Sequence, residues 1–271
     1  GQRSVPISLK RVAASNADAD QCAERNVVFS APLVAAQKAK ELVDEQKAIV
    51  TESRFGNHRY RTVSVLDGHV KTIEIPEERY KAANLNKAMR SWMRAQITEY
   101  YGCQAGMNHQ SDGKLSEPDF SQEMTPEFWN GQLLVLKESY SAYCGGAHPS
   151  GGIAGYMMWN LATDTGVNPW TWINLSKTKH GDAVPEKLNA IILAGATRNK
   201  NGDDCADSVN ENKSYQLRPG KKGLVFSTSF AHVIQACNED IEVPYGELLP
   251  HLTPEGVAAV KSLMRPESGR K

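Results

Sequence analysis

The stretch ESYSAYCGGAHPSGGIAGYMMWNLATDTG, residues 138–166, decides how this sequence is interpreted. It overlaps a run from Gln132 to Tyr143 that is typical of a β-strand, and it continues into a glycine-rich loop over Cys144–Gly152. A second strand is predicted over Gly155–Leu161 and a turn over Asp164–Gly166. Strands joined by such short turns predict an antiparallel β-meander.

The segments before this stretch add a hairpin, a helix and a loop. Tyr60–Ile75 alternates apolar and polar residues around an Asp-Gly pair at Asp67, which predicts a hairpin. Asn84–Tyr101 has the apolar spacing of an amphipathic helix, and Gly102 is the predicted stop. Gln104–Asn130 is polar and interrupted by proline, so it is expected to be a long surface loop and a candidate binding edge.

The segments after it alternate between strands and a helix. Strands are predicted over Trp170–Leu175, Leu224–Thr228 and Ile241–Val243, and a helix over Pro185–Leu193. Segments of this kind predict an α+β fold in which a mixed, mainly antiparallel sheet packs against one or two helices.

Composition excludes several classes of function. The 271 residues contain 31 Lys and Arg and 31 Asp and Glu, scattered along the chain, so no basic face for a nucleic acid is expected. No apolar run reaches the roughly 20 residues of a membrane span. The sequence predicts no cofactor and no metal site, because its five cysteines form no CxxC pair and have no histidine at zinc-ligand spacing.

Cysteine usage favours export. Cys144 and Cys205 lie in polar, glycine- or aspartate-rich settings, where disulfides are more expected than buried thiols. Our expected pairs are Cys103 with Cys144 and Cys205 with Cys237, which leaves Cys22 unpaired, although spacing alone does not fix connectivity. The alternative is a cytosolic protein with five reduced cysteines.

Three segments resemble a known family: IEIPEERYKAANLNKAMRSWM, then residues 138–166, then KKGLVFSTSF with IEVPYGELLPHL. The family is an exported domain without assigned function, found at the C-terminus of lysozyme-sensing anti-sigma factors, in peptidoglycan-deacetylase proteins and in a secreted mycobacterial antigen. The second segment is the most specific, and its matching residues are Tyr140, Gly145 to His148, Trp159, Asn160 and Gly166. The resemblance implies the fold, the compartment and a binding function.

The sequence also departs from the family pattern. Cys144 stands where a small or polar residue is expected before Gly-Gly, and about the first sixty residues match nothing in the family. We therefore expect an N-terminal segment of unclear role over residues 1–60, the family-like α+β domain over 61–252, and a C-terminal helix and tail over 253–271.

His148 is the first candidate for chemistry, because an imidazole on a glycine-rich turn can act as a base or a ligand. No GxSxG or HExxH motif accompanies it, so the sequence assigns no catalytic residue. A purely structural role is the alternative, in which the glycines adopt unusual backbone angles and His148 bonds the neighbouring strand.

Aromatic residues flank the same loop and are candidate anchors for a protein or a sugar. If strand alternation holds, Tyr140 and Tyr143 face opposite sides of the sheet, so at least one of them lies outside the core. The candidate binding residues are Tyr140, Tyr143, Gly145, Gly146, His148 and Trp159.

The resemblance implies a periplasmic or secreted protein that binds a protein partner in the cell envelope. The implied partner is a lysozyme-type muramidase or another peptidoglycan-cleaving enzyme, which this chain would inhibit, neutralise as an immunity factor, or sense. A peptidoglycan-binding module is the first alternative, and a hydrolase that uses His148 is the second.

Overall fold

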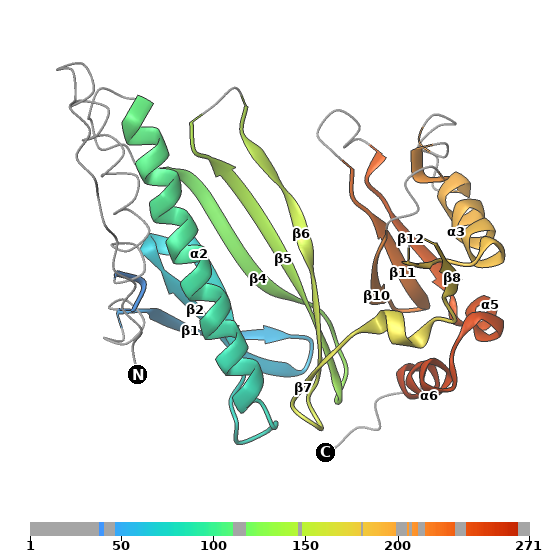
Figure 1. Cartoon of the computed structure of the whole chain (residues 1–271). Helices are drawn as coiled ribbons and strands as arrows, with labels where there is room; N and C mark the ends of the chain where they lie inside the picture. The colour runs from blue at the N-terminus through green and yellow to red at the C-terminus, as the bar shows by residue number, and fades with distance from the viewer. Residues whose placement is uncertain are drawn as a thin grey trace, which may run out of the picture.

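The computed structural model describes residues 38–40, 47–110, 118–145, 148–179, 181–198, 205, 208–210, 215–230 and 237–264. Its main feature is a seven-stranded sheet in the order β1-β2-β3-β4-β5-β6-β7 (Figure 1). The strands are β1 (Ile49–Phe55), β2 (His58–Val65), β3 (Val70–Glu74), β4 (Asp119–Trp129), β5 (Leu133–Tyr143), β6 (Ser150–Asn160) and β7 (Thr165–Val167). Neighbours are antiparallel except β3 and β4. The predicted α+β class and the β-meander are confirmed.

Helix α2 (Ala83–Gln110) joins β3 to β4 and covers one face of the sheet (Figure 1). A parallel pair needs such a crossover, because its two strands run in the same direction. Leu85, Met89 and Ile97 recur at multiples of four and are buried against the sheet. Trp92 is half-buried and donates its indole N–H to Glu138 of β5 at 2.9 Å. The residues of this helix therefore form a core layer, as their spacing predicts.

The prediction that this helix stops before Gly102 was wrong, since α2 continues to Gln110. A glycine inside a helix costs about 1 kcal/mol relative to alanine. Here Cys103 is buried in the core and bonded to Cys144 at the end of β5. Tertiary contacts therefore extend the helix beyond the point at which local propensity ends it.

The expected surface loop over Gln104–Asn130 was also wrong. Its first residues continue α2, residues 111–117 lie outside the described part, and Asp119–Trp129 forms β4. Phe120, Met124 and Trp129 of this strand are buried, while polar residues alternate with them. Pro126 lies beside an irregularity in the β4–β5 register. The prolines and the polar residues on one face predicted a loop, although the segment forms a central strand.

The β2–β3 hairpin forms as predicted. Residues Leu66–Gly68 make a 3₁₀ turn, η1, in which Asp67 has φ of 53° and Gly68 has φ of 96°. Residue 60, where the N-terminal segment was expected to end, lies inside β2, and β1 precedes it in the same sheet. Within the described part of the chain, the sheet therefore begins at Ile49.

Strand β5 is buried on both faces near its start. Leu134 and Leu136 lie in the core beneath α2, whereas Leu133 and Val135 lie in a second core on the opposite face. A run of four apolar residues is expected where both faces of a strand are covered. The C-terminal part of the chain supplies that second cover.

The C-terminal unit consists of a three-stranded antiparallel sheet, short helices and a small hairpin (Figure 1). Its elements are η2 (Pro169–Trp172), β8 (Ser176–Thr178), β9 (Gly181–Ala183), α3 (Glu186–Arg198), β10 (Tyr215–Pro219), β11 (Gly223–Thr228), β12 (Asp240–Pro244), α5 (Tyr245–Leu248), η4 (Leu249–His251) and α6 (Pro254–Leu263). The strand predicted over Trp170–Leu175 was wrong, because Asn168 caps a 3₁₀ turn there and only Ile173 forms a β-bridge, to Leu252. The predicted strands within β11 and β12 and the helix within α3 are confirmed.

Two disulfides join Cys103 to Cys144 and Cys205 to Cys237, the pairs expected from the sequence. Cys22 lies outside the described residues. Disulfides persist in oxidising compartments, so both bonds are consistent with a periplasmic or extracellular protein. Among the described residues, no helix combines the length and the apolar composition needed to cross a membrane.

Candidate functional site

The candidate site is the tip formed by the end of β5, the loop after it and the start of β6, which we call the β5–β6 tip (residues 143–150). Strand β5 ends at Tyr143 and β6 begins at Ser150. Cys144 follows Tyr143 directly and is bonded to Cys103 in α2, with the two Cα atoms 4.5 Å apart. A Cβ atom on Gly106 would lie 3.0 Å from the carbonyl oxygen of Cys144, so the helix and the tip are in close contact. The base of the tip is therefore held against α2 at two points.

The expected alternation of the two tyrosines follows from the β4–β5 register, which is regular from Asp119 opposite Tyr143 to Gln122 opposite Tyr140. Ala142 packs in the core beneath α2, and Tyr140 lies on the same face of β5. Tyr143 therefore lies on the opposite face, away from α2. Its side chain is half-buried.

The loop between these strands presents polar and backbone groups. Gly145 has φ of 82°, a conformation that residues with a side chain rarely adopt, and this agrees with a backbone requirement for glycine. His148 and Pro149 are exposed. Gly146 lies outside the described residues.

Trp159 lies at the other end of β6. It pairs with Leu134 and Gly166, whereas Ser150 pairs with Ala142 near the tip. Trp159 is nine positions after Ser150 in the strand, which corresponds to about 30 Å at the usual rise. The structure therefore brings together Tyr143, Gly145 and His148, and it leaves Trp159 outside this group.

Trp159 instead belongs to a hydrogen-bonded cap on α2. Its indole N–H donates to Asp164 at 2.9 Å, and the same carboxylate accepts from the backbone N–H groups of Asn84 at 2.6 Å and Leu85 at 3.1 Å. Burial favours a raised pKa for Asp164, but these three donors outweigh burial and the pKa is lowered. The Thr-Gly turn of the family-like segment therefore holds the first turn of the helix.

Other residues in the family-like segments also have structural contacts. The side chain of Asn86 bonds both the N–H and the carbonyl of Ile75, each at 2.9 Å. The side chain of Asn160 accepts from the N–H of Ala162 at 2.9 Å, which closes the turn after β6. Both asparagines therefore have structural contacts within this chain.

Sequence reasoning missed a polar cluster between the two sheets. Arg218 of β10 is buried, pairs with Asp240, approaches Glu127 at 3.8 Å and lies over the ring of Tyr156 at 4.7 Å. Lys137 also pairs with Glu127, at 3.2 Å. The sequence analysis assigned no element to residues 215–219, and only the three-dimensional structure brings these charges together.

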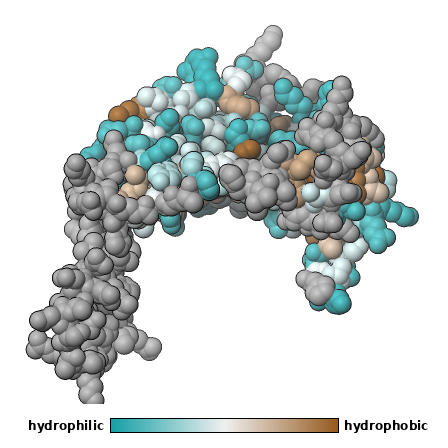
Figure 2. Space-filling view, turned by 90° about the horizontal axis from the view of Figure 1, so that it is seen from above, coloured by the Kyte–Doolittle hydropathy of each residue, from teal (hydrophilic) through white to brown (hydrophobic). Residues whose placement is uncertain are grey.

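The described surface carries few large hydrophobic areas on the face seen in Figure 2, which is mostly hydrophilic or neutral with small and separate hydrophobic areas. Near the tip, Ile153 of β6 is an exposed hydrophobic residue. Within the described part of the chain, no three His, Cys, Asp or Glu side chains gather in a way that could hold a metal ion.

Comparison with known proteins gives structural likeness only. No protein-family model matches the sequence, and no curated protein matches it significantly. The chain is similar to a DUF3298 family protein from Pseudomonas aeruginosa PAO1, with a TM-score of 0.47 and 14% identity over 76% of this chain and 93% of that one. It is also similar to a DUF3298 family member from Bacteroides fragilis, with a TM-score of 0.45 and 12% identity over 78% of this chain and 94% of that one.

Proposed function

We propose that this chain is an exported protein that binds a protein partner of the cell envelope through its β5–β6 tip. The observation that carries the proposal is the tip itself, which presents Tyr143, Gly145 and His148 on a base fixed to α2 by the Cys103–Cys144 disulfide. A recognition surface that is fixed before binding loses less conformational entropy when the partner docks.

The proposed partner is a peptidoglycan-cleaving enzyme of the lysozyme type. The resemblance of residues 138–166 to the domain of lysozyme-sensing anti-sigma factors supports this class of partner. Tyr143 provides an amphipathic ring and His148 a polar group, a combination that suits the polar surface of an extracellular enzyme. The chain then acts as an inhibitor, an immunity factor or a sensor.

Tyr140 and Trp159 have a supporting part in this proposal. Tyr140 lies on the α2 side of the same strand as Tyr143, and Trp159 bonds Asp164 at the opposite end of β6. The proposed contact residues are Tyr143, Gly145, Gly146 and His148, and Tyr140 and Trp159 belong to the sheet that carries the tip.

The test is a pull-down from envelope extract with the oxidised chain as bait and mass spectrometry of the retained proteins. Wild type is compared with Tyr143→Ala/His148→Ala and with the control Leu249→Ala, whose exposed side chain lies in the C-terminal unit. The proposal predicts a muramidase that is retained by wild type and by the control and lost from the double variant.

Three other results would count against this function. Retention of purified peptidoglycan without any protein would support the glycan-binding alternative. Hydrolysis of peptidoglycan by wild type, lost in His148→Ala, would identify an enzyme instead. A muramidase retained equally by all three variants would remove the tip as the binding surface.

A further inference from the structure

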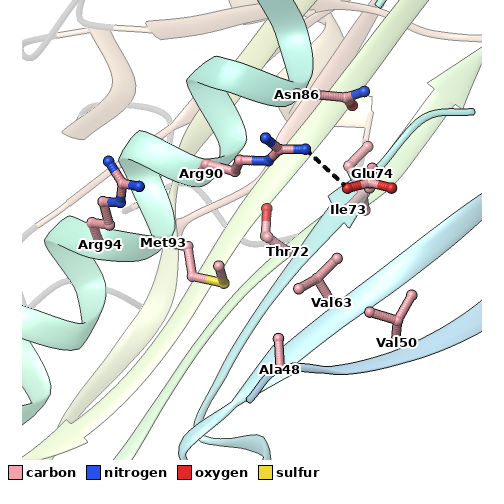
Figure 3. Close-up of a pocket in the computed structure, with 10 residues that line it drawn as sticks. All are labelled: Ala48, Val50, Val63, Thr72, Ile73, Glu74, Asn86, Arg90, Met93 and Arg94. Carbon is pink, nitrogen blue, oxygen red and sulfur yellow. Dashed lines mark hydrogen bonds and ion pairs between the residues drawn. The ribbon is translucent and has the colours of Figure 1, made fainter. Parts of the chain in front are cut away.

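A cavity of about 430 Å³ lies between α2 and the β1–β3 end of the large sheet (Figure 3). Cavities of roughly 300–1,000 Å³ are typical of sites for small molecules, and such sites combine apolar walls with a few polar groups. The β5–β6 tip contributes no residue to it. This cavity is therefore a separate candidate site.

Strand pairing and helix spacing explain which residues line the cavity. Val50 pairs with Val63, and Val63 pairs with Thr72, so the three form a row across β1, β2 and β3. On α2, Arg90 and Arg94 are one turn apart and Met93 lies between them, so all three share one side of the helix. The cavity thus has a β-branched floor and a wall with an apolar centre and cationic ends.

Thr72 is a buried polar residue in the lining of the cavity. It is only 2% exposed, and its Oγ1 has no hydrogen-bond partner among the described residues. Figure 3 shows the hydroxyl pointing into the space between β3 and α2. A buried hydroxyl without a partner is unfavourable, and this one can donate to or accept from a bound molecule.

Arg90 is an exposed cation at the rim of the cavity. Glu74 pairs with Arg90 at 3.4 Å and also with Arg61 at 3.1 Å, so its carboxylate is already neutralised. The Arg90 side chain remains 58% exposed, and its guanidinium has donors beyond the one that Glu74 accepts. An anionic group is therefore favoured at this opening.

We propose that this cavity binds a medium-chain aliphatic carboxylate. The carboxylate of the ligand lies at Arg90 and accepts a hydrogen bond from the Thr72 hydroxyl. The aliphatic chain lies over Val50, Val63 and Met93. This inference goes beyond the envelope-binding function and does not rest on it.

The test is calorimetric titration of the oxidised full chain with decanoate, with decanol as the neutral probe of equal chain length. We expect decanoate to bind with one-to-one stoichiometry and decanol to bind at least about tenfold more weakly. Thr72→Val, which removes the hydroxyl and keeps the shape, and Arg90→Gln should each weaken decanoate binding about tenfold. Val63→Phe, which fills the cavity, should abolish it.

Matched controls separate the cavity from general effects. Thr62→Val repeats the threonine change on β2 at a residue outside the cavity lining, and Arg59→Gln repeats the arginine change. Both should bind decanoate as wild type does. Sedimentation with phosphatidylglycerol vesicles tells whether the ligand is the free acid or an acyl chain of a lipid. If the ligand is a lipid acyl chain, wild type sediments with the vesicles and Val63→Phe does not. If the ligand is the free acid, the vesicles do not carry wild type down through this cavity.

The inference is overturned if decanoate shows no saturable binding at millimolar concentration. It is equally overturned if Thr72→Val and Arg90→Gln bind as tightly as wild type, or if decanol binds as tightly as decanoate. Far-UV circular dichroism checks the folding of each variant. Arg90→Gln keeps the test decisive even if Val63→Phe fails to fold, because Arg90 is largely exposed.

Discussion

Asp164 joins three parts of the chain that are distant in sequence. Its carboxylate binds the amides of Asn84 and Leu85 at the start of α2 and the indole of Trp159 in β6. A carboxylate at a helix N-terminus satisfies amides that have no partner within the helix and complements the helix dipole. One side chain in a turn therefore fixes the start of the helix against the end of the meander.

We predict that Asp164→Ala lowers the free energy of unfolding by about 1–2 kcal/mol near neutral pH. The lowered pKa of Asp164 means that its stabilisation is complete above the usual carboxyl range and is lost as the pH falls through the lowered value. Urea denaturation of wild type and variant across acidic pH measures this difference. If the difference in unfolding free energy between wild type and Asp164→Ala became larger towards acidic pH, the predicted role of Asp164 would be contradicted.

Tyr215 gives a prediction at alkaline pH. Burial raises its pKa to about 12, and its hydroxyl donates to Asn189 at 2.9 Å. Because the unfolded chain loses this proton near pH 10, the contribution of Tyr215 to stability is present below about pH 10 and is lost as the pH rises towards the folded value. Tyr215→Phe should lower the free energy of unfolding by about 1 kcal/mol at neutral pH. Between neutral and alkaline pH, the variant should lose less of its free energy of unfolding than wild type does, as measured by urea denaturation. Equal alkaline losses would contradict the assignment.

At the residue scale, sequence reasoning found the cysteine pairs and the opposite faces of Tyr140 and Tyr143. Both depend on local signals, namely polar loop settings for the cysteines and a period of two along a strand. The contacts of Trp159, Thr72 and Arg218 depend on residues far away in sequence, so no local pattern reveals them.

Among the elements, the end of α2 and the β5–β6 tip are joined by the Cys103–Cys144 disulfide. We predict that Cys103→Ser/Cys144→Ser lowers the free energy of unfolding by about 2–4 kcal/mol in chemical denaturation. Hydrogen exchange should increase most in the last turns of α2. Gly102 has a low helix propensity, and without the disulfide these turns are no longer bonded to the β5–β6 tip.

The second disulfide provides the matched control. Cys205→Ser/Cys237→Ser should also destabilise the chain, but it should leave hydrogen exchange at the end of α2 unchanged, because that bond lies in the C-terminal unit. If the two double variants increase exchange at the end of α2 equally, the disulfide does not act on the tip locally.

Element boundaries reveal where local propensity and tertiary contacts disagree. Gly102 predicts a helix end, yet the buried Cys103 keeps the helix intact for two further turns. Pro126 and the polar residues around it predict a loop, yet the alternating Phe120, Met124 and Trp129 form a central strand. The β2–β3 hairpin was predictable because its turn residues and its alternation agree with its tertiary setting.

For the whole molecule, Arg218 is the charged residue that joins the C-terminal sheet to the large sheet. Arg218→Ala removes a buried guanidinium from Asp240, whose side chain is half exposed, while Glu127 keeps its pair with Lys137, so we predict a loss of about 1.5–3 kcal/mol in the free energy of unfolding. Lys177→Ala is the control, because its pair with Asp182 is largely exposed and should contribute less than about 1 kcal/mol. Guanidinium denaturation compares the two, and similar losses would contradict the role of Arg218.

The class of fold was predictable from the sequence, but the two-sided packing of the large sheet was not. The apolar run Leu133–Leu136 is compatible with any doubly covered strand, and it does not indicate that α2 covers one face and the C-terminal unit the other. The two-sided cover leaves the β5–β6 tip as the exposed end of the meander, which is the basis of the proposed binding surface.

The most direct test of that surface is the affinity of the oxidised chain for a purified lysozyme-type muramidase, measured by biolayer interferometry for wild type, Tyr143→Ala/His148→Ala and Leu249→Ala. We predict saturable binding by wild type and by Leu249→Ala, and binding weakened at least about tenfold in the double variant, chiefly through faster dissociation. Absence of binding by wild type, or equal affinity of all three proteins, would contradict the account.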